Sequence, residues 1–89
     1  MEFRWNDWNL EHLARHGVRP EEAEAIVNGA SRPYPEWRGD GKRLVIGRGA
    51  GDRFLQVIFL IDENGPLFVI HARPLTDSEK RRFRRRLGL

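Results

Sequence analysis

The chain has 89 residues, which is enough for one domain with one hydrophobic core and too few for two. It contains no cysteine, so disulfides and thiolate metal sites are excluded. The longest apolar run is the five residues from Val57 to Ile61, far below the roughly 20 that a membrane span requires. The first residues lack the basic and then apolar pattern of a secretory signal, and we expect a cytosolic protein without membrane association.

The net charge of +3 is unevenly distributed along the chain. Residues 1–41 carry five basic and eight acidic side chains, whereas residues 42–89 carry eleven basic and five acidic ones. The net charges of the two parts are therefore −3 and +6. A polyanion would bind to the second part. A basic surface that simply faces solvent explains the same run about equally well.

Two helices are predicted in the first third of the chain. Asn6 or Asp7 can cap a helix that ends near Gly17, because glycine suits the left-handed conformation that closes helices. Pro20 is followed by two glutamates and opens a second helix, since proline tolerates the first turn and carboxylates favour the positive end. This helix stops near residues 28–29.

From residue 31 onward the pattern changes to that of strands. The segment 31–37 contains two prolines, so it can only be an edge strand or a loop. Residues 43–48, 53–61 and 67–73 are predicted strands, and the second of them is nearly continuously apolar, as expected in the middle of a sheet. The Asn-Gly pair at 64–65 predicts a tight hairpin.

A basic helix is predicted to close the chain. Thr76 and Glu79 match the capping box that begins a helix, and Phe83 and Leu87 form a narrow apolar stripe that can dock on the sheet. The predicted fold class is α+β. We expect one small domain over residues 1–89, with an antiparallel sheet of about four strands, two N-terminal helices and one basic C-terminal helix.

A titratable imidazole and a fixed cation stand together at the end of the last predicted strand. Side chains of a strand alternate between faces, so His71 and Arg73 should share one face with Val69. The opposite face should carry Phe68, Ile70 and Ala72. Histidine can transfer a proton near neutral pH, and arginine can bind phosphate oxygens. This pair makes RNA the first substrate to consider.

Several short motifs follow one another in a specific order and spacing. They are Phe3-Arg4-Trp5-Asn6, Arg15-His16-Gly17-Val18, Glu21-Glu22-Ala23, Arg43 through Gly47, and Ala72-Arg73 with Thr76 and Glu79 before the basic helix. Together they resemble the BrnT family of toxins over almost the whole chain. The resemblance implies the small fold of RelE-type toxins and a ribonuclease activity that stops translation. It also implies a BrnA-like antitoxin, which neutralises the toxin and binds the operator DNA.

Metal-free RNA cleavage removes a proton from the 2′-hydroxyl, stabilises the phosphorane and protonates the leaving 5′-oxygen. We hypothesise that Arg73 and Arg53 stabilise the transition state while His71 transfers a proton, an effect typically worth about 10²- to 10⁴-fold. Lys42 or Arg43 can approach from the neighbouring strand. Alternatively, His71 only hydrogen-bonds a backbone group at the strand end.

Other residues are candidates for binding RNA rather than cleaving it. Arg48 lies beside a glycine-rich turn that a phosphate backbone can approach. The final helix offers Arg81, Arg82 and Arg85. Trp37 can stack on an unpaired base or pack against the protein, whereas Trp5 and Trp8 are expected in the core. The basic helix is equally suited to an acidic antitoxin segment.

No metal or cofactor is expected. His12 and His16 have the helical spacing of a zinc pair, but no third ligand is evident, and His16 has an alternative role at the helix end. The main alternative function is a nucleic-acid-binding or antitoxin-binding module on the same scaffold without activity. A third possibility is an inactive relative kept as a regulatory partner.

Overall fold

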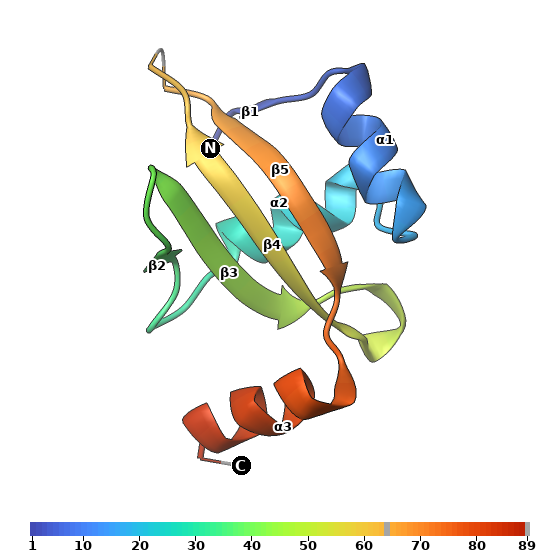
Figure 1. Ribbon diagram of the computed structural model, residues 1–89, viewed down its shortest axis with the longest axis vertical. Helices are drawn as coiled ribbons and strands as arrows, with labels where there is room; N and C mark the ends of the chain where they lie inside the picture. Colours follow the sequence, from blue (N-terminus) through green and yellow to red (C-terminus); the bar gives the residue numbers. More distant parts are fainter. Residues whose placement is uncertain (64, 89) are drawn as a thin grey trace.

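The computed structural model of the protein describes residues 1–63 and 65–88. The helices are α1 (Asp7–Arg15), α2 (Pro20–Asn28) and α3 (Asp77–Arg86), and the strands are β1 (Phe3–Arg4), β2 (Glu36–Trp37), β3 (Lys42–Arg48), β4 (Phe54–Ile61) and β5 (Leu67–Pro74) (Figure 1). A short 3₁₀ turn at Ala50–Asp52 joins β3 to β4. The predicted α+β class is confirmed. None of the described helices has the length and apolar character that a bilayer crossing requires.

The described strands form one sheet in the order β1-β5-β4-β3-β2. Four of them are antiparallel to their neighbours, whereas β1 pairs with β5 in parallel and places Phe3 opposite Leu67. The sheet thus has one strand more than the four or so that were predicted. The parallel pairing of β1 with β5 was not expected, because two residues carry too little pattern to indicate where a strand pairs. The apolar strand β4 lies in the middle of the sheet, as predicted.

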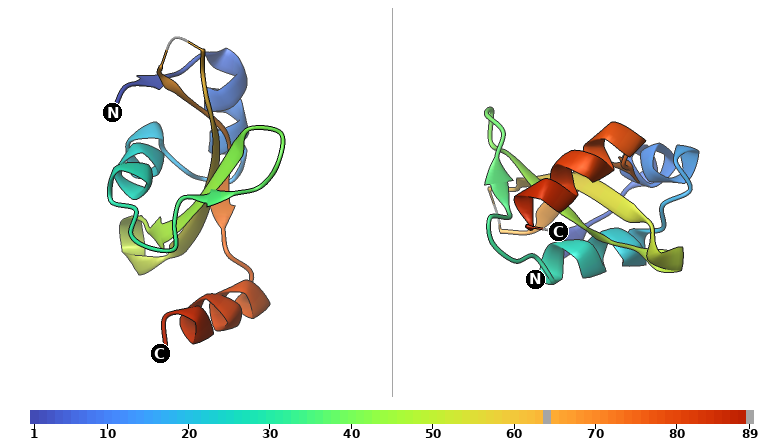
Figure 2. Two further views of the ribbon diagram at one scale, coloured as in Figure 1. Left: turned by 90° about the vertical axis from the view of Figure 1, so that its left-hand side faces the viewer. Right: turned by 90° about the horizontal axis from the view of Figure 1, so that it is seen from below.

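The two faces of the sheet have different surroundings. In Figure 1, α2 lies behind the strands, and the second view in Figure 2 shows α3 crossing the lower end of the sheet. Gly47 lies on the face that α2 covers. A Cβ at this position would lie only 3.1 Å from Cγ2 of Ile26 in α2. We call this face, which carries Val45, Val57 and Ala72 in one cross-strand row, the covered face. The opposite, open face carries the next row.

That next row on the open face consists of Ile46, Gln56 and Arg73. The core fills the space between the covered face and α2, and Leu13 joins it from α1, which packs against β5. Its buried members there include Leu13, Val18, Ala23, Ile26, Val27, Val45, Leu55, Val57, Leu67, Val69 and Ala72. A smaller aromatic cluster holds α3, in which the buried Phe83 ring lies 5.2 Å from that of Phe54 and 6.2 Å from that of Tyr34.

Strand β5 contains one residue more than β4 over the same length. Ile58 pairs with His71 and Phe59 pairs with Val69, so Ile70 has no counterpart and forms a β-bulge. His71 and Arg73 do share the open face, as predicted. The prediction that Val69 shares their face, opposite Ala72, is wrong, because the extra residue shifts the alternation by one.

The predicted helix ends are confirmed. Asn6 caps α1, Gly17 has a left-handed φ of 67°, Pro20 begins α2, and Thr76 and Glu79 form the capping box of α3. The residue Asn64 of the predicted hairpin lies outside the described residues.

The expectation that both N-terminal tryptophans lie in the core is wrong for Trp8. Its side chain is 48% exposed and lies against the ring of His12, at 4.0 Å between centroids. Trp5 is half-buried, and its indole nitrogen donates a hydrogen bond of 2.7 Å to Glu24. Trp8 thus belongs to the surface that is available for binding.

The buried amide of Asn9 provides a test of the fold. Its Nδ2 donates to the carbonyl of Arg4 at 3.1 Å, and its Oδ1 accepts from the backbone N–H of Asn6 at 2.8 Å. Asn9→Ala leaves the carbonyl of Arg4 and the N–H of Asn6 without these hydrogen bonds. We therefore expect the free energy of unfolding to fall by about 1–3 kcal/mol in urea titrations. The matched control is Asn28→Ala, at the exposed end of α2, which should change it by less than about 0.5 kcal/mol. Equal losses of stability in Asn9→Ala and Asn28→Ala would contradict a structural role for the Asn9 amide.

Candidate functional site

The open face brings together an imidazole, a guanidinium and polar side chains from three elements. His71 and Arg73 come from β5, Gln56 comes from β4, and Glu79 and Arg82 come from α3. Helix α3 begins three residues after the end of β5, and its N-cap is Thr76. This short connection allows its first turn to reach back to the end of the strand.

Arg73 is held in place by a carboxylate of that first turn. Its Nη1 and Nη2 atoms donate to the two carboxylate oxygens of Glu79 at 2.8 and 2.9 Å, and Nη1 also donates to the carbonyl of Pro74 at 3.0 Å. The hydrogen bonds from Arg73, and next from the Thr76 amide, lower the pKa of Glu79 to about 2. Counting donors, Arg73 keeps its Nε hydrogen and one Nη2 hydrogen for a ligand.

His71 faces a second imidazole across the boundary between β5 and α1. The rings of His71 and His16 are arranged edge to face, with centroids 5.6 Å apart. His71 is half-buried, whereas His16 is exposed. Burial, followed by the charges of Arg73, His16 and His12, lowers the pKa of His71 below its usual 6.5. At neutral pH His71 is therefore mainly in the form that accepts a proton.

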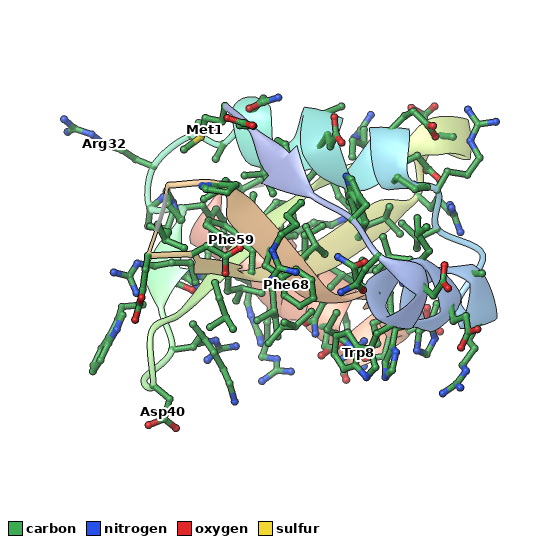
Figure 3. All side chains as sticks on the ribbon, turned by 90° about the horizontal axis from the view of Figure 1, so that it is seen from above. Met1, Trp8, Arg32, Asp40, Phe59 and Phe68 are labelled. Carbon is green, nitrogen blue, oxygen red and sulfur yellow. The ribbon has the colours of Figure 1, made fainter. Side chains whose placement is uncertain are left out.

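Flat rings continue this surface along the side of β5. The Trp8 ring stacks on Phe68 at 5.9 Å between centroids, and the Arg4 guanidinium lies 4.1 Å from the centre of the Phe68 ring. Figure 3 shows Trp8 on the other side of the sheet from α2. An exposed ring such as that of Trp8 is a platform on which an unpaired base can stack.

The histidines do not form a metal centre with carboxylates. His12 is used locally, since its Nδ1 lies 2.8 Å from the carbonyl oxygen of Trp8. Within residues 1–63 and 65–88, no group of three or more His, Asp or Glu side chains is placed to hold a metal ion.

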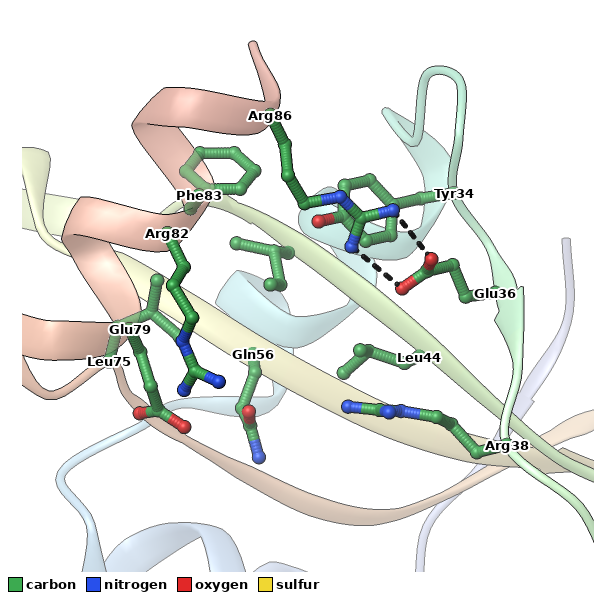
Figure 4. Close-up of a pocket in the computed structure, with 11 residues that line it drawn as sticks. Tyr34, Glu36, Arg38, Leu44, Gln56, Leu75, Glu79, Arg82, Phe83 and Arg86 are labelled. Atoms are coloured by element: carbon green, nitrogen blue, oxygen red, sulfur yellow. Dashed lines mark hydrogen bonds and ion pairs between the residues drawn. The ribbon is translucent and has the colours of Figure 1, made fainter.

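A cavity of about 280 Å³ opens next to this row, between the sheet, α3 and the segment that leads into β2 (Figure 4). It is lined by Tyr34, Glu36, Arg38, Leu44, Ile46, Gln56, Leu75, Glu79, Arg82, Phe83 and Arg86. Arg86 bridges α3 to β2, because its two terminal nitrogens donate to Glu36 at 2.6 and 3.2 Å. The hydrogen bond from Arg86 is the largest cause of the lowered pKa of Glu36.

Arg53, predicted to stabilise the transition state, has a structural partner. Its Nη2 donates to the carbonyl of Gly17 at 2.8 Å and to the Glu22 carboxylate at 3.0 Å, and the Glu22 side chain is only 8% exposed. Burial raises the pKa of Glu22, but hydrogen bonds from Ala50, Arg19 and Arg53 outweigh this effect and lower it overall. Arg53 thus neutralises a buried carboxylate.

The other predicted candidates are dispersed. Lys42 pairs with Leu60 on the open face, two strands away from β5, and Arg43 pairs with Phe59 on the covered side. Arg48 lies 3.7 Å from Asp52.

The candidates for RNA binding in β2 and α3 also separate. Trp37 is 68% exposed on the edge strand β2. In α3, Arg82 lines the cavity together with Glu79, Phe83 and Arg86, whereas the positions of Arg81 and Arg85 are not part of the lining formed by the described residues. Of the predicted set, the structure places His71 and Arg73 together on the open face, and it places Arg82 at the adjacent cavity.

Sequence reasoning missed several members of this surface. His16, Trp8 and Arg38 were not predicted site residues. A signal for His16 was present, since two histidines stand four residues apart in α1, but nothing in the sequence paired α1 with β5.

No family model matches the chain. A search of curated proteins also finds no match. The functional assignment therefore depends on the chemistry of the open face and on the resemblance of the sequence motifs.

The role of Arg53 can be separated from catalysis by its effect on stability. Arg53→Ala leaves the Glu22 carboxylate buried without its cation, so we expect the free energy of unfolding to fall by roughly 2–4 kcal/mol. The control is Arg48→Ala, which removes the same charge from an exposed pair and should change it by less than about 1 kcal/mol. Urea unfolding measures both. An unchanged stability for Arg53→Ala would return Arg53 to the list of catalytic candidates.

Glu79 should make the protein sensitive to acid. Its pKa in the folded protein is about 2, below its ordinary value of 4.5, so the unfolded chain binds this proton more tightly. The stabilisation is complete above about pH 4.5 and is lost as the pH falls toward 2. We expect Glu79→Gln to lower the free energy of unfolding by about 2 kcal/mol at pH 7 and by much less near pH 2.5.

The control is Asp77→Asn, which removes the same charge from an exposed position in the same turn. A constant difference between Glu79→Gln and the wild-type protein at all pH values would contradict this role of Glu79.

Proposed function

We propose that this protein is a metal-independent endoribonuclease that inhibits translation, and that it is the toxin of a type II toxin–antitoxin pair. The main support is the pair of imidazoles, His71 and His16, beside the fixed guanidinium of Arg73 on the open face. The excess of cations in residues 42–89 favours a polyanionic substrate. The toxin role and a BrnA-like antitoxin partner come from the resemblance to BrnT toxins.

In the proposed reaction the two histidines have opposite tasks. Neutral His71 accepts the proton of the 2′-hydroxyl, and the 2′-oxygen attacks the adjacent phosphorus. The bond between phosphorus and the 5′-oxygen breaks, and His16 donates a proton to that oxygen as it leaves. The products are a 2′,3′-cyclic phosphate and a 5′-hydroxyl. The lowered pKa of His71 suits it to the role of the base.

Arg73 would bind the phosphate whose charge increases in the transition state. Its two remaining donors can contact non-bridging oxygens, while Glu79 fixes the plane of the guanidinium. Because protein groups supply both proton transfers and the cation, this mechanism requires no metal. It does require the 2′-hydroxyl, so DNA should not be cleaved.

The antitoxin in this proposal acts by competition. An acidic segment lying on α3 would cover the arginines of this helix and the mouth of the open face beside it. Operator DNA would then be bound through the antitoxin rather than by this chain.

A second candidate is a nucleic-acid-binding module without activity. It is favoured by the carboxylate partners of Arg73 and Arg53, which neutralise two of the proposed catalytic cations. Such a protein would retain RNA in a salt-sensitive way and leave it intact.

Incubation of the purified protein with labelled single-stranded RNA in excess EDTA tests the proposal. We expect fragments that end in a 2′,3′-cyclic phosphate. The value of kcat/KM should fall as the pH is lowered through a midpoint below 6.5, because protonated His71 cannot accept a proton. His71→Ala should lower the rate by about 10²- to 10⁴-fold and remove this acidic limb.

Other outcomes distinguish the alternatives. Cleavage by His71→Ala at the wild-type rate, together with an inactive Arg73→Ala, would show that catalysis depends on cations alone. Salt-sensitive binding of RNA that remains intact would identify the binding module. Growth arrest on expression, relieved by a neighbouring open reading frame, tests the toxin role.

A further inference from the structure

The cavity between the sheet and α3 has no role in the proton transfers. Its floor and one wall are apolar and consist of Leu44, Ile46, Leu75 and Phe83. Figure 4 shows the guanidinium groups of Arg38 and Arg82 entering from opposite sides, both directed toward the amide of Gln56. The other lining residues are polar or charged, and polar groups that converge over an apolar floor can orient a ligand.

Two of the three arginines at the cavity differ from the third in their pairing. Arg86 is bound by Glu36, whereas Arg38 and Arg82 form no ion pair with any other residue that the structure describes. Their donors are therefore available to a ligand. Two planar guanidinium groups can hydrogen-bond to the edge of a ring and can also stack on its face.

The Tyr34 side chain supports a ligand at the α3 end of the cavity. Tyr34 is 8% exposed, and its hydroxyl is buried without a hydrogen-bond partner among the described residues. In Figure 4 this hydroxyl points from the segment before β2 toward α3. The half-exposed side chain of Arg86 lies over the ring, 5.5 Å from its centre. A small displacement of Arg86 would allow a ligand atom to supply the missing acceptor.

We propose that this cavity binds a guanine base of the RNA. This inference rests on the proposed function for the presence of RNA. Guanine offers O6 and N7 to an arginine, which is the most common base-specific contact, and its N1–H can donate to the oxygen of Gln56. Its face would lie on the apolar floor. A simple anion fits less well, because the carboxylates of Glu36 and Glu79 also line the cavity.

The size and position of the cavity match a base next to the cleaved bond. At about 280 Å³ it is near the lower limit of roughly 300 Å³ for ligand sites, so it suits one base rather than several. Gln56 pairs directly with Arg73 across β4 and β5, and His71 lies two residues before Arg73 on the same face. A guanine held by Gln56 thus places its sugar and phosphate toward the candidate catalytic groups.

Binding of RNA that cannot be cleaved tests this inference without relying on activity. The probes are four short single-stranded oligonucleotides with 2′-O-methyl groups at every position, identical except for one central base, and binding is followed by fluorescence anisotropy. We expect the oligonucleotide with guanine to bind about tenfold more tightly than the other three. Arg82→Ala should remove this preference. Arg81→Ala loses the same charge from the adjacent position and should keep it.

A second variant tests whether Arg82→Ala acts only by disturbing the position of α3. Arg38→Ala alters the opposite side of the cavity and should also reduce the preference for guanine. Equal affinity for the four oligonucleotides would overturn the inference, and so would an equal loss in Arg81→Ala and Arg82→Ala. Preference for guanine without any cleavage of unmodified RNA would support the cavity and reject the endoribonuclease. Cleavage of unmodified RNA without a preference for guanine would support the endoribonuclease and reject the guanine site.

Discussion

At Ile70, strand β5 carries one residue more than β4, and this extra residue decides which side chains reach the open face. The bulge allows Val69 and Ala72 to be buried together against the helices, although they are three residues apart. It thereby turns His71 and Arg73 toward the opposite side of the sheet. In a regular strand, a face containing Val69 would also contain His71 and Arg73, and two polar groups would enter the core. The hydrophobic core and the candidate site therefore depend on the same irregularity.

Helix α3 links stability to the open face. It is attached through Phe83 and through two ion pairs, Arg73 with Glu79 and Arg86 with Glu36. The first pair fixes the helix N-terminus and at the same time orients the cation nearest to His71. The Glu79 carboxylate that holds Arg73 also reduces the positive charge that Arg73 can offer to a phosphate. The chemistry must then rely more strongly on the imidazoles.

The sequence predicted the features that are coded locally. The caps at Asn6 and Thr76 and the central strand β4 were correct because they depend on neighbouring residues. The bulge at Ile70 was not predictable, since it depends on the pairing with β4. The meeting of His16 with His71 was missed for a similar reason, as their side chains are far apart in the chain and meet only when α1 packs beside β5.

The arginines show most clearly that formal charge alone does not identify the residues that bind a ligand. Arg53 and Arg82 have the same formal charge, but Arg53 neutralises the buried Glu22 whereas Arg82 lines a cavity. A cation contributes to binding only when its donors are not already used, and the sequence does not reveal partners that come from distant segments. Arg82 and Glu79 also stand on consecutive turns of α3, so this one helix serves both the cavity and Arg73. A partner that shifted or covered α3 would therefore alter recognition of the base and the position of the phosphate-binding cation together.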